Sequence, residues 1–398
     1  MPRYLTAGES HGYGLIGMIE SFPAGIPISQ EKINIQLGRR QQGFGRGGRM
    51  KIEKDKVTIL SGLRYGKTLG SPIALLISNK DWVNWKKIMD PIKPVARNLT
   101  SMQKKQAFDV TAPRPGHTDL AGAIKYNTHD LRNILERASA RETAARVACG
   151  SVARQLLGHF GINIASHVIA IGGIKAIKKR IDFDIICNLA DNSPVRCVDA
   201  ESEKIMIAQI KSAMKSHDTL GGVFEIRATG IPAGLGNNSQ WYQKFDAQLA
   251  AAIMSIHSIK GVEIGEGFSN AGKSGSKVHD RIYYDSPNKH PQSKGFLRKT
   301  NRAGGIEGGL TNGSELIVRG ACKPISTLMQ PLNTVDVKSK KNVQAMIERS
   351  DICVVPAAAI VGEAMVAMVL SDAFLEKFGG DNLAEIENNY ESYLKADF

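Results

Sequence analysis

The sequence predicts an α+β fold, in which long helices and largely antiparallel sheets stack as a layered sandwich of the β-α-α-β type. Helical and strand-like patterns follow one another in mixed order, without the regular alternation of a parallel βαβ fold. The 398 residues contain no long Ser/Gly/Pro linker, low-complexity tract or internal repeat. Because 42% of the residues are hydrophobic, the chain can bury a large core. We therefore expect a single large domain over residues 1–398.

The first elements expected along the chain are two helices and two strands. Residues 130–157 are rich in Ala, Arg and Glu and are followed by Gly158 and Gly161, which is typical of a helix and its end. The remaining patterns predict a strand at 162–171, a helix at 202–216 and a strand at 223–228.

The later part of the chain is expected to hold a helix, two strands and a final helix, at residues 245–259, 277–284, 315–319 and 356–378. The second strand follows the turn signal Asn312-Gly313. The final helix begins at Pro356, which suits a first helical turn because the N–H that proline lacks is not needed there.

The stretch 352–370 is almost wholly apolar and is long enough to span a membrane. Glu363 lies in its middle, and Asp351 and Asp372 border it closely. Its Ala/Val/Met composition suits a helix that protein surrounds on all sides. The stretch therefore predicts a buried core helix, not a membrane span.

The charge of the chain is strongly basic, with 52 Lys and Arg against 38 Asp and Glu and a net charge of +14. Such a charge fits nucleic acid, an anionic membrane surface or a polyanionic small substrate. The five cysteines form no C-x-x-C pair and are odd in number, which predicts reduced thiols. No metal-binding motif appears, and the N-terminus has no apolar signal region, so we expect no metal and a cytoplasmic location.

Three short patterns match well-known signatures but lack their structural context. Residues 8–12 fit G-x-S-x-G, yet almost no chain precedes them and Pro23 interrupts the next segment, which argues against a nucleophile elbow. Residues 12–17 and 43–48 fit G-x-G-x-x-G without opening a helix; the second runs into a polar, strand-like stretch at 50–58. A Rossmann dinucleotide site is therefore not expected.

Residues 38–50 place four arginines among five glycines. Glycine lets a backbone approach a ligand closely, and guanidinium groups grip carboxylate and phosphate with paired hydrogen bonds, which indicates a clamp for a small anion. The alternative is a basic RNA-binding protein that uses this Arg/Gly segment. Such segments work through repetition, whereas this one occurs once and aromatic residues make up only 6% of the chain.

These motifs together resemble the chorismate synthase family. The resemblance spans the chain, with the blocks in the expected order at residues 8–12 (GESHG), 38–50, 114–119 (RPGHTD), 135–143 (LERASARET), 301–309 (NRAGGIEGG), 323–327 (KPIST) and 349–351 (RSD). Two segments depart from the family pattern: 127–130 places its histidine differently, and 79–106 is unusually rich in lysine.

The resemblance implies a lyase that removes phosphate and a ring hydrogen from 5-enolpyruvylshikimate 3-phosphate by anti 1,4-elimination, giving chorismate. It also implies reduced FMN as cofactor without net redox change, a homotetramer, and an external flavin reductant with NADPH as one source. Neither nucleic acid nor membrane is expected as a partner.

The resemblance also assigns roles to individual residues. His11 would donate a proton to the leaving phosphate, His117 would protonate the flavin ring, and Asp351 would draw the flavin N5 proton. Two carboxylates and a phosphate on the substrate call for several cations. The candidate clamps are Arg40, Arg46, Arg49, Arg114 and Arg349, with Arg39 as a further candidate. FMN contacts are implied for Arg137, Ala138, Ser139, His257, Ser258, Gly308, Lys323, Pro324, Ile325, Ser326, Thr327 and Arg349.

Overall fold

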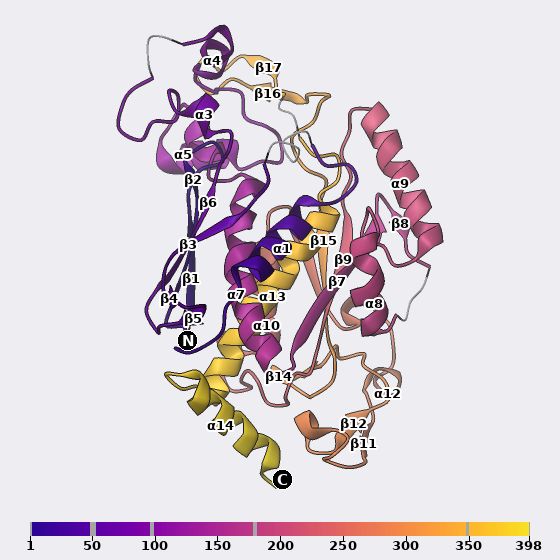
Figure 1. The fold of residues 1–398 in the computed structure, drawn as a ribbon. Helices are drawn as coiled ribbons and strands as arrows, with labels where there is room; N and C mark the ends of the chain where they lie inside the picture. Colours follow the sequence, from indigo (N-terminus) through magenta and orange to yellow (C-terminus); the bar gives the residue numbers. More distant parts are fainter. Residues whose placement is uncertain (1, 48–52, 96–98, 178–180, 348–349, 398) are drawn as a thin grey trace.

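Two antiparallel sheets and the helices packed against them form the core of the computed structural model, which describes residues 2–47, 53–95, 99–177, 181–347 and 350–397 (Figure 1). The first sheet has the order β1 (Arg3–Ala7), β2 (Gly14–Glu20), β6 (Ile73–Ser78), β3 (Val57–Ser61). The second has the order β10 (Ile259–Ile264), β15 (Leu316–Cys322), β9 (Gly222–Thr229), β7 (Asn163–Ile171), β8 (Ile174–Lys175). This mixture of helices and antiparallel sheets confirms the predicted α+β class.

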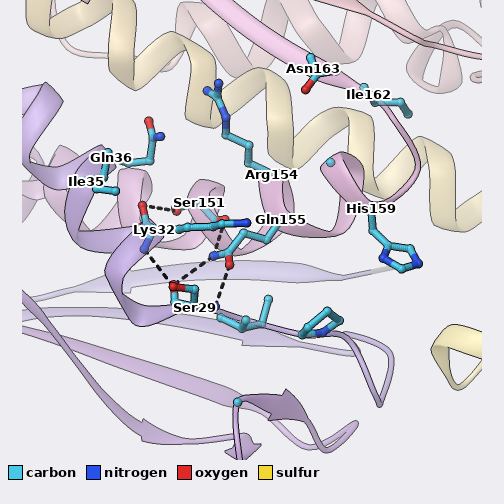
Figure 2. A pocket seen from close by; sticks show the side chains of 14 residues that line it. Ser29, Lys32, Ile35, Gln36, Ser151, Arg154, Gln155, His159, Ile162 and Asn163 are labelled. Carbon is cyan, nitrogen blue, oxygen red and sulfur yellow. Dashed lines mark hydrogen bonds between the residues drawn. The ribbon is translucent and has the colours of Figure 1, made fainter.

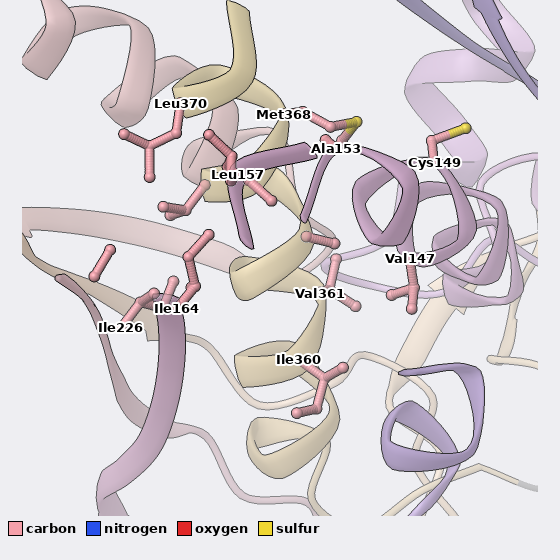
Figure 3. Close-up of a cluster of buried hydrophobic side chains, with 14 of the residues drawn as sticks. Val147, Cys149, Ala153, Leu157, Ile164, Ile226, Ile360, Val361, Met368 and Leu370 are labelled. Carbon is pink, nitrogen blue, oxygen red and sulfur yellow. The ribbon is translucent and has the colours of Figure 1, made fainter. Parts of the chain in front are cut away.

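Two long helices lie against each other, each on one sheet. Helix α7 (Thr143–His159) contacts β2 and β6, and α13 (Val355–Phe378) contacts β7 and β9. Helix α1 (Gln30–Gln41) packs on α7, and α10 (Phe245–Met254) packs on α13 and β10. A single large apolar cluster runs through this region, and Figure 3 shows part of it between the two long helices.

Two glycines of these layers permit close packing. A Cβ on Gly150 of α7 would lie 2.5 Å from the Cβ of Ala364 on α13, so any side chain there would push the two helices apart. A Cβ on Gly17 of β2 would lie 2.6 Å from the sulfur of Cys149. Since protein interiors are packed as densely as organic crystals, neither site can accept added volume cheaply.

The apolar helix α13 is buried, as predicted. It is long and apolar enough to cross a membrane, but 83% of its most apolar window lies inside the protein. Its helical partners and the second sheet surround it, which explains why apolar residues occur on all of its faces.

The remaining elements connect these layers. Helices α8 (Phe183–Leu189) and α9 (Ala200–Lys215) lie beside β7 and β8, and α14 (Leu383–Lys395) follows α13. Short helices and four hairpins complete the described elements: α3 (Trp82–Trp85), α4 (Ser101–Gln106), α5 (Asp119–Tyr126), α6 (Arg132–Leu135), η1 (Ala140–Glu142), η2 (Ala190–Asn192), η3 (Trp241–Gln243), α11 (Gly267–Asn270), α12 (Gly275–Val278), η4 (Pro291–Ser293), β4 (Leu63–Arg64) with β5 (Lys67–Thr68), β11 (Ile282–Tyr284) with β12 (Phe296–Arg298), β13 (Ile306–Glu307) with β14 (Leu310–Thr311), and β16 (Asn333–Val335) with β17 (Asn342–Gln344).

Four predicted elements differ from the structure. The single helix expected at 130–157 is interrupted between α6 and α7, because Ser139 is extended and its hydroxyl caps η1. The helix expected at 245–259 ends at Met254, since Ser258 has φ +68° and cannot continue it. The strand expected at 277–284 is reduced to β11, because its first two residues belong to α12 and the Asp280 carboxylate, which accepts from Thr300 and Ala303, holds the turn that follows. The strand-like stretch at 50–58 forms β3 only from Val57, and its first residues lie outside the described part.

Candidate functional site

The loops that carry the predicted motifs, except residues 301–309, converge at the end of the fold where α1 stops and α7 and α13 begin. The His11 loop joins β1 to β2, so the G-x-S-x-G match lies in a hairpin and not before a helix. Figure 1 shows α3, α4, α5 and the hairpin β16–β17 gathered at this end. The hydrogen bonds between these loops show which of the predicted residues lie close together.

His11 is held by the segment that follows α6. Its Nδ1 lies 2.8 Å from Glu136 Oε1, and its backbone N–H donates to Glu136 Oε2 at 2.8 Å. The imidazole also stacks on Trp85, with the ring centroids 4.1 Å apart and the planes at 25°. About one fifth of the His11 side chain remains exposed, against 2% for Glu136.

His117 is held in the turn that precedes α5. Its Nδ1 lies 2.5 Å from Asp119 Oδ1, and Asp119 Oδ2 accepts from Arg114 Nε at 2.9 Å. Burial alone would raise the pKa of Asp119, but the hydrogen bonds from His117 and Arg114 outweigh it and hold this pKa well below its usual range. Arg114 also donates to Thr327 Oγ1 at 3.0 Å, so the second histidine motif is joined to the segment after β15.

Asp351 lies against the Arg/Gly segment just before α13. Its Oδ1 accepts from the Gly47 N–H at 2.5 Å, and its Oδ2 lies 2.9 Å from Arg46 Nη1. A Cβ on Gly47 would be 3.0 Å from the Ser350 carbonyl oxygen, so glycine permits this close approach. The Ile352 N–H donates to the Gly45 carbonyl at 2.7 Å, which fixes the two segments side by side.

A buried charge network connects these loops. Asp55 Oδ2 lies 2.9 Å from Arg40 Nη2, and Asp55 Oδ1 lies 2.6 Å from Arg141 Nη1. Arg141 also donates to Asn79, whose amide donates to the carbonyls of Glu9 and Gly12 beside His11. Burial lowers the pKa of Arg40 to about 10. The Asp55 carboxylate opposes this effect, and the charges of Arg141 and Arg46 add to it. The network therefore leads from the Arg/Gly segment to the His11 loop.

Among the described residues, the implied flavin contacts are brought together with one exception. Arg137 donates to the Thr6 and Gly8 carbonyls, and Ser139 caps η1. Lys323 donates to the Gly116 carbonyl at 2.7 Å, and Thr219 Oγ1 to the Ile325 carbonyl at 2.8 Å. The Leu220 N–H in turn donates to Ile352, next to Asp351. The segment Lys323, Pro324, Ile325, Ser326, Thr327 thus lies between the second histidine motif and the Asp351 region.

Gly308 is the exception. The Phe245 N–H at the start of α10 donates to the Gly309 carbonyl, whereas Ser255 at the other end of α10 accepts from Arg146. A helix of ten residues is about 15 Å long. Gly308 and His257 therefore lie at opposite ends of α10, and one chain does not bring Gly308 to the other implied contacts.

His257 offers the clearest test of whether a polar ligand fits here. Its Nδ1 is buried and has no hydrogen-bond partner among the described residues. Burial lowers the pKa of His257, and the charges of Arg146, His117 and Arg137 lower it further against the opposing Glu142. A buried imidazole nitrogen that no described residue pairs, near the charges of Arg137 and His117, fits a polar heterocyclic ligand such as a flavin, because buried polar atoms in proteins are almost always paired.

Arg49 and Arg349 lie outside the described residues, and so does part of the 38–50 segment. Arg39, a further candidate clamp, instead pairs with Glu363 at 2.7 Å and Asp191 at 2.9 Å. Sequence reasoning missed Glu136 and Trp85, although Glu136 belongs to the 135–143 block and Trp85 to the lysine-rich departure from the family pattern.

A cavity of about 630 Å³ lies elsewhere, at the ends of α1 and α7 away from these loops (Figure 2). Its wall includes Lys32, Arg154, Gln155 and His159, and none of the predicted site residues. We place the functional site at the convergent loops, because acid, base and anion-binding groups meet there.

Comparison with known proteins finds relatives that match the chain over nearly its whole length. A sequence model of the chorismate synthase family matches residues 2–375. The chorismate synthases of Geobacter metallireducens and Alkaliphilus metalliredigens are each 54% identical to the chain over 99% of its length, covering 98% and 99% of their own. A solved crystal structure of chorismate synthase superimposes with a TM-score of 0.77 at 40% identity, covering 99% of this chain and 97% of its own.

Proposed function

The chain belongs to the chorismate synthase family, and on that premise we propose that it performs an anti 1,4-elimination on 5-enolpyruvylshikimate 3-phosphate. Family membership makes it a lyase of the shikimate pathway. The observation that carries the finer proposal is the convergence of both histidine motifs, the Arg/Gly segment and Asp351 at one end of the fold.

The arginines suit a substrate with two carboxylates and a phosphate. Arg40, Arg46 and Arg114 are each held by a carboxylate of the protein, which fixes their guanidinium groups before substrate arrives. The buried Arg40 Nε has no hydrogen-bond partner within the described residues and is one donor that remains for a ligand. We assign the same anion-binding role to Arg49 and Arg349.

Two residues of the chain handle the protons of the elimination. We assign His11 as the acid that protonates the departing phosphate oxygen, where negative charge grows as the C–O bond breaks. Asp351 is the carboxylate that finally receives the ring proton, so one proton is given and one is taken in each turnover. Arg46 and the Gly47 N–H hold Asp351 in place for this role.

Reduced FMN, when bound, supplies electron density to the substrate ring without net redox change. Arg137, Ala138, Ser139, His257, Ser258, Arg349 and the segment 323–327 would hold it, and His117 would set the protonation of its ring. The His257 Nδ1, which is buried and has no partner in the part of the chain that the structure describes, supports this assignment. Gly308 could join the site only from another subunit.

The decisive test measures phosphate release from the enolpyruvyl substrate under anaerobic conditions. We expect release with reduced FMN and none with oxidised FMN or without flavin, because only the reduced ring is electron-rich. NADPH with an added flavin reductase should restore activity to oxidised FMN, since an external reductant is expected. Equal activity in all three flavin conditions would contradict the mechanism.

We also propose that the chain is a single catalytic domain of β-α-α-β type that acts in the cytoplasm and binds neither nucleic acid nor membrane. The continuous apolar cluster across both sheets supports one domain. The burial of α13 inside the protein supports the absence of a membrane partner. Salt-sensitive, nanomolar binding of RNA would instead favour the alternative of a basic RNA-binding protein.

A homotetramer is our proposed assembly, and the outer face of the first sheet supports it. Leu5 pairs with Met18 and Ala7 pairs with Ile16 on this face. Leu5, Met18, Ile16 and Leu60 are 60%, 37%, 37% and 57% exposed. Figure 1 shows no described helix over this side of the sheet. An exposed apolar sheet face of this kind is typical of an interface between subunits.

Replacing both Leu5 and Met18 with lysine is expected to reduce the assembly to a smaller species. Burying each apolar side chain contributes about 1.5–3 kcal/mol, and a buried unpaired lysine opposes association further. Light scattering after size exclusion measures the mass. Phe268→Lys, at a side chain that is 80% exposed elsewhere, is the matched control. An unchanged mass in the double variant would exclude this face as an interface.

A further inference from the structure

The His11 imidazole is fixed by two residues to which no role has been assigned. Glu136 engages the ring edge at Nδ1, and Trp85 covers one ring face. These residues come from segments about 50 positions apart in the sequence. Their contacts constrain different degrees of freedom of the ring, because an edge contact sets the tautomer and a face contact sets the plane.

Glu136 is a buried hydrogen-bond partner of His11. It is 2% exposed, and its backbone carbonyl accepts from the Ser10 N–H at 3.0 Å. Its carboxylate accepts from both the backbone and the ring of His11. Burial alone would raise the pKa of Glu136, but the bonds from His11 and the charge of Arg132 lower it overall, so Glu136 is ionised at neutral pH.

Trp85 is anchored independently of His11. Its indole N–H donates to Asp81 Oδ2 at 3.0 Å, and the residue is 7% exposed. The Arg132 guanidinium lies 5.2 Å from the Trp85 ring centroid and 3.6 Å from Glu136 Oε1. Arg132 therefore contacts both Trp85, which covers the ring face, and Glu136, which holds the ring edge. Through Trp85, the lysine-rich segment 79–106 contributes to the site.

We propose that Glu136 and Trp85 are positioning residues for His11: the Glu136 carboxylate holds the Nδ1 proton, and the Trp85 ring fixes the imidazole plane. The transferable proton then resides on Nε2. This inference rests on the proposed function, in which His11 is the acid of the elimination. It follows the logic by which a buried carboxylate orients a general acid–base histidine in unrelated enzymes.

Two further charged groups contact the supports of His11: Arg132, on α6, lies beside Glu136, and Asp81, at the start of α3, accepts from the Trp85 indole. Glu136 is in direct contact with the ring, so its removal should dominate over these neighbours.

Glu136→Gln is expected to lower kcat by about 10²–10⁴-fold, because an amide at this position no longer holds the Nδ1 proton of the His11 ring and so no longer selects its tautomer. KM should change little, since Glu136 is assigned no contact with substrate. Glu136→Asp keeps a carboxylate at this position and should recover part of the lost kcat. Equal loss in the two variants, or a loss confined to KM, would overturn the proposal.

The matched control is Glu387→Gln. Glu387 makes the same kind of pair with a histidine, His159, at 2.6 Å, but at the far end of α7. This variant should keep the wild-type kcat. Trp85→Phe should retain most activity, because phenylalanine can still stack on His11, whereas Trp85→Leu should lose it. Equal activity of the two Trp85 variants would remove the role of the ring.

An NMR measurement of the His11 tautomer separates this inference from the proposed function. In protein carrying isotope-labelled histidine, the proton of the neutral His11 ring should reside on Nδ1 in wild type, and Glu136→Gln should lose this preference. An unchanged tautomer overturns the role of Glu136 even if the enzyme is active. A changed tautomer in a protein that releases no phosphate would support the Glu136–His11 contact and contradict the proposed reaction instead.

Discussion

Glu363→Ala is expected to lower the free energy of unfolding by about 3–5 kcal/mol, the cost of leaving buried charges without their partner. The Glu363 carboxylate lies at the centre of α13 and is 2% exposed. Arg39 and Arg154 approach it to 2.7 and 2.5 Å, and Arg196 to 3.5 Å. Without it, three guanidinium groups lose their shared partner, and Asp191 pairs with only two of them, Arg39 and Arg196.

The Glu363 carboxylate should also make the free energy of unfolding depend on pH. Burial alone would raise the pKa of Glu363, but the three arginines outweigh burial and place this pKa well below its usual range. A carboxyl group whose pKa is lower in the folded state contributes stability above its unfolded pKa of about 4.3. That contribution is lost as the pH falls further. Stability should therefore decline less steeply below about pH 4 in Glu363→Gln than in wild type.

Urea unfolding at neutral pH measures the loss of unfolding free energy in Glu363→Ala, with Glu391→Ala as control. Glu391 also pairs with a cation along a helix, Lys395 at 3.0 Å, but both side chains are more than 60% exposed. Exposed pairs contribute about 0–1 kcal/mol, so the control should barely move the midpoint. Equal destabilisation by the two substitutions would show that Glu363 does not hold the arginines together.

The burial of α13 could be predicted from the sequence, but the partners of Glu363 could not. An acidic residue inside an apolar run indicates an internal partner without saying which of many arginines supplies it. Arg39 illustrates the difficulty, since it sits in the Arg/Gly segment beside candidate clamps. Because Arg39 and Arg40 are adjacent on α1, they point in different directions, one to Glu363 and one to Asp55.

The candidate site shows the same difference between residues that the sequence predicts and partners that only the fold reveals. The motifs around His11, His117 and Asp351 were recognisable because each is a local pattern. Glu136 and Trp85 act through contacts that span 125 and 74 positions, and only the fold brings them to His11. The N-terminal hairpin that presents His11 was also missed, although β1 and β2 alternate exposed and more buried residues.

Asp351→Asn is expected to reduce kcat by about 10²–10⁴-fold, the usual contribution of a general base. Asparagine keeps the size of the side chain and can still accept from the Gly47 N–H, so the Arg/Gly segment should stay in place and KM should change little. Single-turnover phosphate release with reduced FMN measures the loss, and the unfolding midpoint checks that the variant is folded. The control is Asp285→Asn, at a carboxylate that pairs with exposed Lys289 near β11 and should leave turnover intact. Unchanged turnover in Asp351→Asn would exclude Asp351 as the base, whereas a loss confined to KM would assign it to anchoring Arg46 for substrate binding.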